Sequence, residues 1–166
     1  MRHKSFVRIL ALDLHPRRFG YAVLEAPDSL LDWGVRSCRK KGKPTDVLLH
    51  RRLRQLLDLW KPTVLVIRTA SRTLPRQKLL REKLLEGVAA EAKNYRTSVR
   101  KASDNVETST KYESARRVAE HFPVLARSLP PQRKPWESED YRMSMFTAAT
   151  LAIAELNIAR SSPEPS

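Results

Sequence analysis

The stretch that decides the fold is VRILALDL, residues 7–14, followed after a short break by FGYAVLE, residues 19–25. Both runs are apolar, carry β-branched residues and lack helical spacing, so each is predicted to be a β-strand. The segment His15-Pro16-Arg17-Arg18 between them suits a turn. A third run, Leu30 to Arg36, follows Ala26-Pro27-Asp28, and the three strands together predict an antiparallel meander.

The rest of the chain alternates helices and strands. Apolar residues at helical spacing predict a helix from Thr45 to just before Pro62, and TVLVI, residues 63–67, predicts a strand buried on both faces. The remaining predicted elements are a helix from Leu74-Pro75 to about Arg96, a strand over Thr97–Ala102, a helix that opens with the capping box Thr110–Glu113, and a largely buried closing helix over Met143–Leu156.

This order predicts an α/β fold with a mixed five-stranded sheet, in which an antiparallel three-strand meander is joined by parallel strands and helices cover both faces. We expect a single domain over residues 1–158 and a disordered tail over residues 159–166, where prolines and polar residues dominate. The three prolines of Ser128–Pro135 predict a loop ahead of the closing helix.

The composition is that of a basic chain with enough apolar material for a core. Its 166 residues include 32 Lys and Arg against 18 Asp and Glu, a formal net charge of +14, and 41% are hydrophobic. Such a charge repels itself in isolation, so we expect a polyanionic partner, with nucleic acid as the first choice. A basic surface that serves only solubility is the alternative, although a smaller charge would suffice for that.

Cysteine use and hydropathy bear on where the chain works. Cys38 is the only cysteine, so no internal disulfide can form, and a reduced compartment such as the cytoplasm is expected. No run reaches the roughly 18 apolar residues that span a bilayer, because Asp13, His15 and Arg68 interrupt the strongest ones. A membrane is therefore not expected as a partner.

Basic residues gather in loops and at the ends of the predicted elements, positions that suit contacts with phosphates rather than with base edges. For any single cluster a solvated face is the plainer interpretation, but several clusters on one small domain favour a shared polyanion. Trp136, in the proline-rich loop, is a candidate for stacking on a base. The candidate phosphate-binding residues are Arg17, Arg18, Lys40, Lys41, Arg72, Arg76, Arg100 and Lys101.

Asp13 is the first candidate functional residue, because its carboxylate lies in an apolar predicted strand. A carboxylate among leucines on a central strand is costly to bury without a partner. A divalent cation would compensate it, since hard metals prefer oxygen ligands. The alternatives are a strand-end carboxylate that faces solvent or pairs with Arg8, Arg17 or Arg18. The four histidines show no spacing typical of a zinc site.

Five segments together resemble one known family. They are ILALDL at residues 9–14, FGYAV at 19–23, PTVLVI at 62–67, TSVRKA at 97–102 and AATLAIA at 148–154. In this order they resemble the ribonuclease H-like nucleases of the RuvC type, the Holliday junction resolvases, over about residues 6–156. The resemblance implies a ribonuclease H-like fold, hydrolysis of phosphodiesters by two divalent metals, Mg²⁺ or Mn²⁺, and branched DNA or structured RNA as partner.

Carried over by position, the resemblance makes Asp13 the first metal-binding acid and a candidate catalytic residue. Two later acid positions of the family are occupied by Arg68, at the end of the fourth strand, and by Thr147, in the closing helix. A guanidinium repels a divalent cation, so Arg68 is predicted to pair with Asp13 in its place. The nearest acids that could complete a metal site, and hence further candidate catalytic residues, are Glu137, Glu139 and Asp140.

Three hypotheses follow for the function. The first is a metal-dependent endonuclease with Asp13 as the central ligand, and the second is a catalytically degenerate module that binds nucleic acid. The third is a basic assembly or ribosome-associated factor that uses the fold as a scaffold. A homodimer is compatible with each of them.

Overall fold

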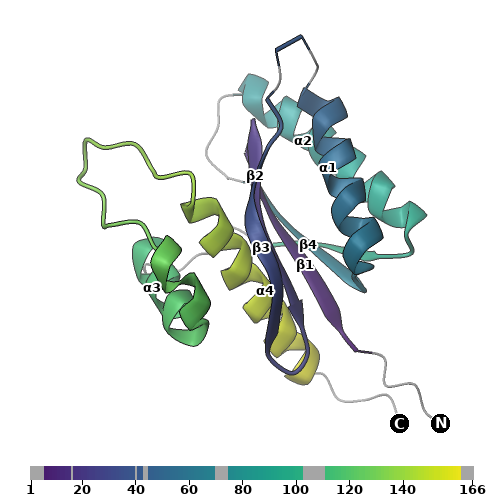
Figure 1. The fold of residues 1–166 in the computed structure, drawn as a ribbon. Helices are drawn as coiled ribbons and strands as arrows, with labels where there is room; N and C mark the ends of the chain where they lie inside the picture. The colour runs from purple at the N-terminus through teal and green to yellow at the C-terminus, as the bar shows by residue number, and fades with distance from the viewer. Residues whose placement is uncertain are drawn as a thin grey trace, which may run out of the picture.

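The computed structural model describes residues 6–15, 17–39, 41–42, 45–69, 75–102 and 111–161. Five strands form one sheet in the order β3-β2-β1-β4-β5, with helices on both faces (Figure 1). The elements are β1 Arg8–Leu14, β2 Arg18–Glu25, β3 Ser29–Ser37, α1 Thr45–Trp60, β4 Val64–Thr69, α2 Pro75–Asn94, β5 Ser98–Lys101, α3 Lys111–His121, the 3₁₀ helix η1 Pro123–Ser128 and α4 Met143–Ser161.

The predicted mixed sheet is confirmed. Strands β1, β2 and β3 pair antiparallel, as the meander predicts, whereas β4 pairs parallel with β1 and β5 parallel with β4. Strand β1 therefore lies in the middle of the sheet, with an antiparallel neighbour on one side and a parallel neighbour on the other. Its residues from Ile9 to Leu14 are all buried, because helices cover the sheet above and below.

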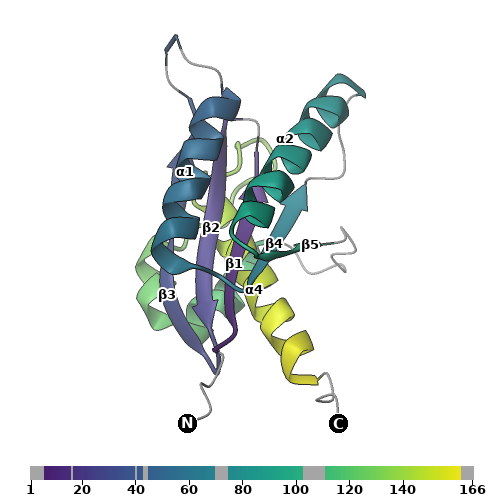
Figure 2. The same cartoon turned by 90° about the vertical axis from the view of Figure 1, so that its right-hand side faces the viewer.

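Alternation along the strands divides the core into two layers. Ile9 and Ala11 of β1 pack with the residues of α3, η1 and α4, and Leu10 and Leu12 pack with those of α1 and α2. Figure 2 shows α1 and α2 lying across one face of the strands, with α4 crossing behind them. The alanines of α4, among them Ala148, Ala149 and Ala152, are fully buried, so this helix lies close against the sheet.

Several boundaries differ from those that the sequence predicts. Strand β4 continues to Thr69, one residue past Arg68, which lies at the end of this strand as predicted and has Asp13 as its register partner. The 3₁₀ helix η1 was not predicted and ends at Ser128, where the expected loop begins. Helix α4 extends to Ser161, beyond the predicted end of the closing helix at Leu156, and the division into a domain over residues 1–158 and a tail over residues 159–166 stays a prediction. Its last turns continue a helix whose apolar side packs on the sheet.

Other expectations lie outside the described residues, namely Thr110 of the capping box and residues 162–166 of the tail. Among the helices that the structure describes, none is long and apolar enough to cross a membrane.

Candidate functional site

The central strands β2, β1 and β4 each contribute one residue to a row that crosses the sheet. Asp13 in β1 is the register partner of Gly20 in β2 and of Arg68 in β4. All three lie on the face that α4 covers, since Ala11 and Val66, two residues earlier in their strands, belong to the core of that face. The row lies near the carboxyl ends of the parallel strands β1 and β4, where α/β sheets commonly hold their ligands.

Two groups of the protein hold the buried carboxylate of Asp13, which is 3% exposed. Nε2 of His15 lies 2.8 Å from Oδ2 of Asp13, and Nη1 of Arg68 lies 4.0 Å from Oδ1. The side chains of His15 and Arg68 retain 24% and 13% exposure. The hydrogen bond and the guanidinium charge together offset the desolvation of the carboxylate.

The pairing of Asp13 with Arg68 is thus confirmed, while pairing with Arg8 is wrong because Arg8 bonds to Glu25 at 2.8 Å. Sequence reasoning missed His15 as a partner. The signal was present, since residues two apart on an extended chain point to the same side. The turn that orients His15 is closed by a hydrogen bond from its backbone N–H to the Arg18 carbonyl, 2.9 Å.

The first turn of α4 lies directly on this row. A Cβ at Gly20 would stand 2.2 Å from the carbonyl carbon of Ser144 and 2.5 Å from the backbone nitrogen of Met145, so only glycine allows this approach. Thr147, at a position where the resemblance implies an acid, donates its hydroxyl to the Met143 carbonyl at 3.1 Å. The Thr147 hydroxyl therefore makes a hydrogen bond within α4 itself.

The side chains around Asp13 do not fit the two-metal site that the resemblance implies. Such a site needs several oxygen ligands, and of Asp13, His15 and Arg68 only Asp13 supplies a carboxylate. Across the ranges that the structure describes, no three His, Cys, Asp or Glu side chains gather into a metal-binding group. The Arg68 cation beside Asp13 adds repulsion toward a divalent ion.

The other three candidate acids lie in the loop before α4 and are engaged there. Glu139 binds Nζ of Lys111 at 3.2 Å, and Glu137 accepts a backbone hydrogen bond from Lys134. Asp140 accepts three hydrogen bonds from Arg142, one from the backbone N–H at 2.9 Å and two from the guanidinium at 3.0 and 2.9 Å. These bonds hold the pKa of Asp140 below its usual range, and the charge of Arg18 lowers it further.

A cavity of about 440 Å³ lies between this loop and the start of α3 and is lined by Glu137, Glu139 and Asp140 but not by Asp13. The structure therefore gathers these three acids around a separate hollow. Their joint role with Asp13 in one metal site stays a prediction, which this arrangement does not support.

The candidate phosphate-binding residues differ in their surroundings. Arg17, Lys41 and Lys101 are exposed, and Arg18 is half-buried beside Asp140. Arg100 is exposed but bridges to the buried Glu155 of α4, with 2.9 Å between Nε and Oε1. The side chains of Lys40, Arg72 and Arg76 lie outside the described part of the chain.

Solved structures of Holliday junction resolvases share this architecture. Thermus thermophilus RuvC in complex with a Holliday junction substrate matches with a TM-score of 0.65 and 16% identity, over 96% of this chain and 99% of that one. The fowlpox virus resolvase with Holliday junction DNA gives 0.57 and 14%, over 92% and 99%. The yeast mitochondrial resolvase Ydc2 gives 0.54 and 16%, over 93% and 82%. No protein-family model and no curated protein sequence matches the chain.

The chain therefore has the ribonuclease H-like fold of the RuvC type, as its opening hairpin and later segments indicate. At identities of 16% or less, the likeness to these three proteins concerns the fold. Because one fold hosts many activities, the function of this chain rests on the chemistry of its own residues.

Proposed function

We propose that this chain binds branched DNA, mainly through its phosphates, at the end of the sheet where β1 and β4 finish. One observation carries the proposal: a chain with a net charge of +14 has, over 96% of its length, the fold of a resolvase solved with a Holliday junction substrate. Charge alone would suit any polyanion, and the fold shared with a resolvase solved with a Holliday junction substrate supports branched DNA among them.

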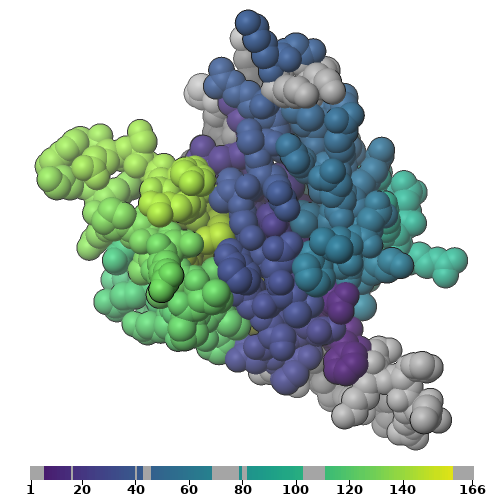
Figure 3. Space-filling view, viewed as in Figure 1, coloured from purple at the N-terminus to yellow at the C-terminus, as the bar shows by residue number. Residues whose placement is uncertain are grey.

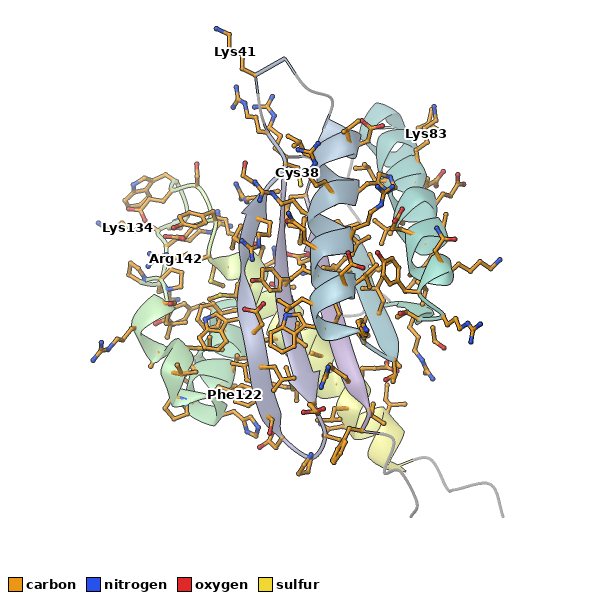
Figure 4. The ribbon with its side chains drawn as sticks, turned by 45° about the vertical axis from the view of Figure 1, so that its right-hand side comes forward. Cys38, Lys41, Lys83, Phe122, Lys134 and Arg142 are labelled. Carbon is orange, nitrogen blue, oxygen red and sulfur yellow. The ribbon has the colours of Figure 1, made fainter. Side chains whose placement is uncertain are left out.

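Exposed cationic side chains at the end of the sheet where β1 and β4 finish support this end as the DNA-binding surface. Arg17 lies in the turn between β1 and β2, and Lys41 in the connection from β3 to α1, both exposed. Figure 4 shows Lys41 at the far tip of that connection, beyond Cys38. Cationic side chains in exposed turns reach phosphates without reading bases, so affinity without strong sequence preference is expected.

Metal-dependent cleavage of the bound DNA, with Mg²⁺ or Mn²⁺, is the finer activity that the resemblance implies. It requires Asp13 to be joined by further acids, whereas Arg68 and His15 are its neighbours in the structure. That observation is the reason to keep a second candidate, a module that binds the junction without cutting it. The two candidates share the binding step and differ only in hydrolysis.

The test compares a four-way DNA junction with a duplex of equal length, with single-stranded DNA and with a four-way RNA junction, by fluorescence anisotropy across a salt series. We expect the DNA junction to bind at least tenfold more tightly than the duplex, with log Kd rising linearly with log salt. The double variant Arg17→Glu/Lys41→Glu should lose most of the affinity. Lys61→Glu/Lys93→Glu, with the same charge change on exposed residues at the opposite end of the sheet, is the matched control.

Equal affinity for all four ligands, or equal losses in the two double variants, would contradict the proposal. A homodimer, which would present two copies of the site to a two-fold junction, stays a prediction that sedimentation of the free and bound protein tests. A cytoplasmic location, expected from the lone Cys38, also remains a prediction.

A further inference from the structure

The loop from Leu129 to Arg142, called here the Trp136 loop, displays an aromatic side chain at its tip. Trp136 is 78% exposed, more than any other large apolar side chain in the part of the chain that the structure describes. The loop projects from the body of the molecule as a separate lobe (Figure 3). An indole ring exposed to this degree presents a large flat apolar surface that a ligand can cover.

Hydrogen bonds hold the tip in one shape. The Glu137 N–H donates to the Lys134 carbonyl at 3.0 Å, and the Lys134 N–H donates to the Glu137 carboxylate at 3.2 Å. Nη1 of Arg133 donates to the Glu137 carbonyl at 2.9 Å, and Pro135 restricts the backbone between them. The turn therefore presents Trp136 outward on a fixed support.

Two cations belong to the turn that carries the ring, and one of them lies over it. Nζ of Lys134 lies 5.5 Å from the centre of the Trp136 ring, and Arg133 belongs to the same turn. The other residues of this turn include Gln132, Pro135, Glu137 and Ser138, so Trp136 is the one large apolar side chain over residues 132–138 rather than part of an apolar patch. A protein partner would favour such a patch, whereas an aromatic flanked by cations suits a base and its phosphates.

The loop also stands at the proposed DNA-binding end. It leads into the first turn of α4, which lies on Gly20, the register partner of Asp13. At the base of the loop, Asp140 lies near enough to Arg18, the first residue of β2, for the arginine charge to lower the pKa of Asp140. Figure 4 shows Lys134 and Arg142 on this side of the molecule and Phe122 farther down.

We infer that Trp136 stacks on an unpaired base of branched nucleic acid, with Lys134 and Arg133 on the flanking phosphates. The inference rests on the proposed function and deepens it, because an unpaired or easily opened base is available at a junction and not inside a duplex. Stacking of one base on an aromatic side chain changes affinity by about 5- to 100-fold.

The test uses the full chain and a four-way junction with 2-aminopurine at the branch point, beside a second junction that carries the probe within an arm. Trp136→Ala is expected to weaken junction binding by about 5- to 100-fold, with duplex binding and melting temperature unchanged. Trp136→Phe should retain most of the affinity, because its ring also stacks, but should lose the quenching of tryptophan emission that accompanies binding. The branch-point probe alone should respond to the wild-type protein.

Wild-type affinity for the junction in Trp136→Ala would overturn the inference while leaving the proposed function standing. A changed oligomeric state in Trp136→Ala, with junction affinity unchanged, would also overturn it, since the ring would then be a contact between protein chains. Failure of the wild-type protein to bind any junction would instead be the failure of the proposed function. Trp60→Phe, at a half-buried tryptophan, is the control for the emission measurement.

Discussion

Asp13 and Arg68 are register partners on the parallel strands β1 and β4, and the Arg68 guanidinium lies 4.0 Å from the Asp13 carboxylate. The pair stands where the resembling family is expected to hold metal ions between acids. Because both charges are largely removed from water, the Asp13 carboxylate depends on Arg68 and on His15 for compensation. The pair therefore governs both the stability of the sheet and its capacity for a metal.

Loss of the arginine alone should destabilise the fold. We expect Arg68→Ala to lower the free energy of unfolding by about 3 kcal/mol, because the buried Asp13 carboxylate loses the guanidinium charge beside it and keeps the hydrogen bond to His15. The double variant Asp13→Asn/Arg68→Ala should recover part of that loss, since no charge is then left without compensation. Urea unfolding of the wild-type protein, Asp13→Asn, Arg68→Ala and the double variant gives the coupling energy between the two side chains directly. Arg51→Ala, at an exposed residue of α1, should stay within about 0.5 kcal/mol of wild type, and strictly additive effects of the two substitutions would contradict the pairing.

Metal affinity should appear only when the cation is replaced by an acid. Mg²⁺ should leave the melting temperature of the wild-type protein unchanged. The variant Arg68→Glu places two carboxylates side by side, so its free energy of unfolding should rise by about 1.4 kcal/mol when the Mg²⁺ concentration is tenfold above the Kd. Asp13→Asn/Arg68→Glu should lose that gain. Thermal unfolding with and without Mg²⁺ measures both.

The same metal argument predicts weak or no cleavage of a four-way junction by the wild-type protein in Mg²⁺ or Mn²⁺. The assay is a denaturing gel of end-labelled strands. Efficient cutting that Asp13→Asn abolishes would show that the degenerate interpretation is wrong and that other acids complete the site.

Gly20 should tolerate no side chain. Gly20→Ala places a Cβ 2.2 Å from backbone atoms of Ser144, so α4 has to move off the sheet, and we expect a loss of about 3 kcal/mol together with weaker junction binding. Gly87→Ala is the contrasting control, because its Cβ meets only the tip of the His50 ring at 2.8 Å, which can rotate away, and alanine favours a helix. Equal effects of the two substitutions in thermal unfolding would refute this account.

Alkaline pH should expose the burial of Cys38. Burial raises the pKa of this thiol to about 11, above its value in the unfolded chain, so its contribution to stability is complete below about pH 9 and is lost as the pH rises toward 11. The unfolding free energy of the wild-type protein should therefore fall more steeply between these values than that of Cys38→Ala. Parallel curves for the two proteins would count against a buried thiol, as would rapid labelling of native Cys38 by a thiol reagent at pH 8.

Much of the fold could be predicted from the sequence because it depends on local patterns. The apolar runs of residues 7–14 and 19–25 and the fully buried run at residues 63–67 indicate their strands without reference to the rest of the chain. The ends of elements were less predictable, since β4 continues to Thr69 and α4 runs to Ser161 through packing and pairing with distant residues. The turn of 3₁₀ helix after α3 likewise depends on Leu125, which is fully buried against the other elements.

The site divides in the same way. The sequence by itself singled out Asp13 as a buried carboxylate in need of a partner, because its apolar neighbours already determine its burial. Its nearest hydrogen-bonding partner, His15, follows from a turn whose geometry only the structure supplies. The separation of Glu137, Glu139 and Asp140 from Asp13 was decided by tertiary structure as well. Spacing along a chain limits how far apart two residues can lie, but the packing of α4 on Gly20 and the register of β1 with β4 decide which side chains meet.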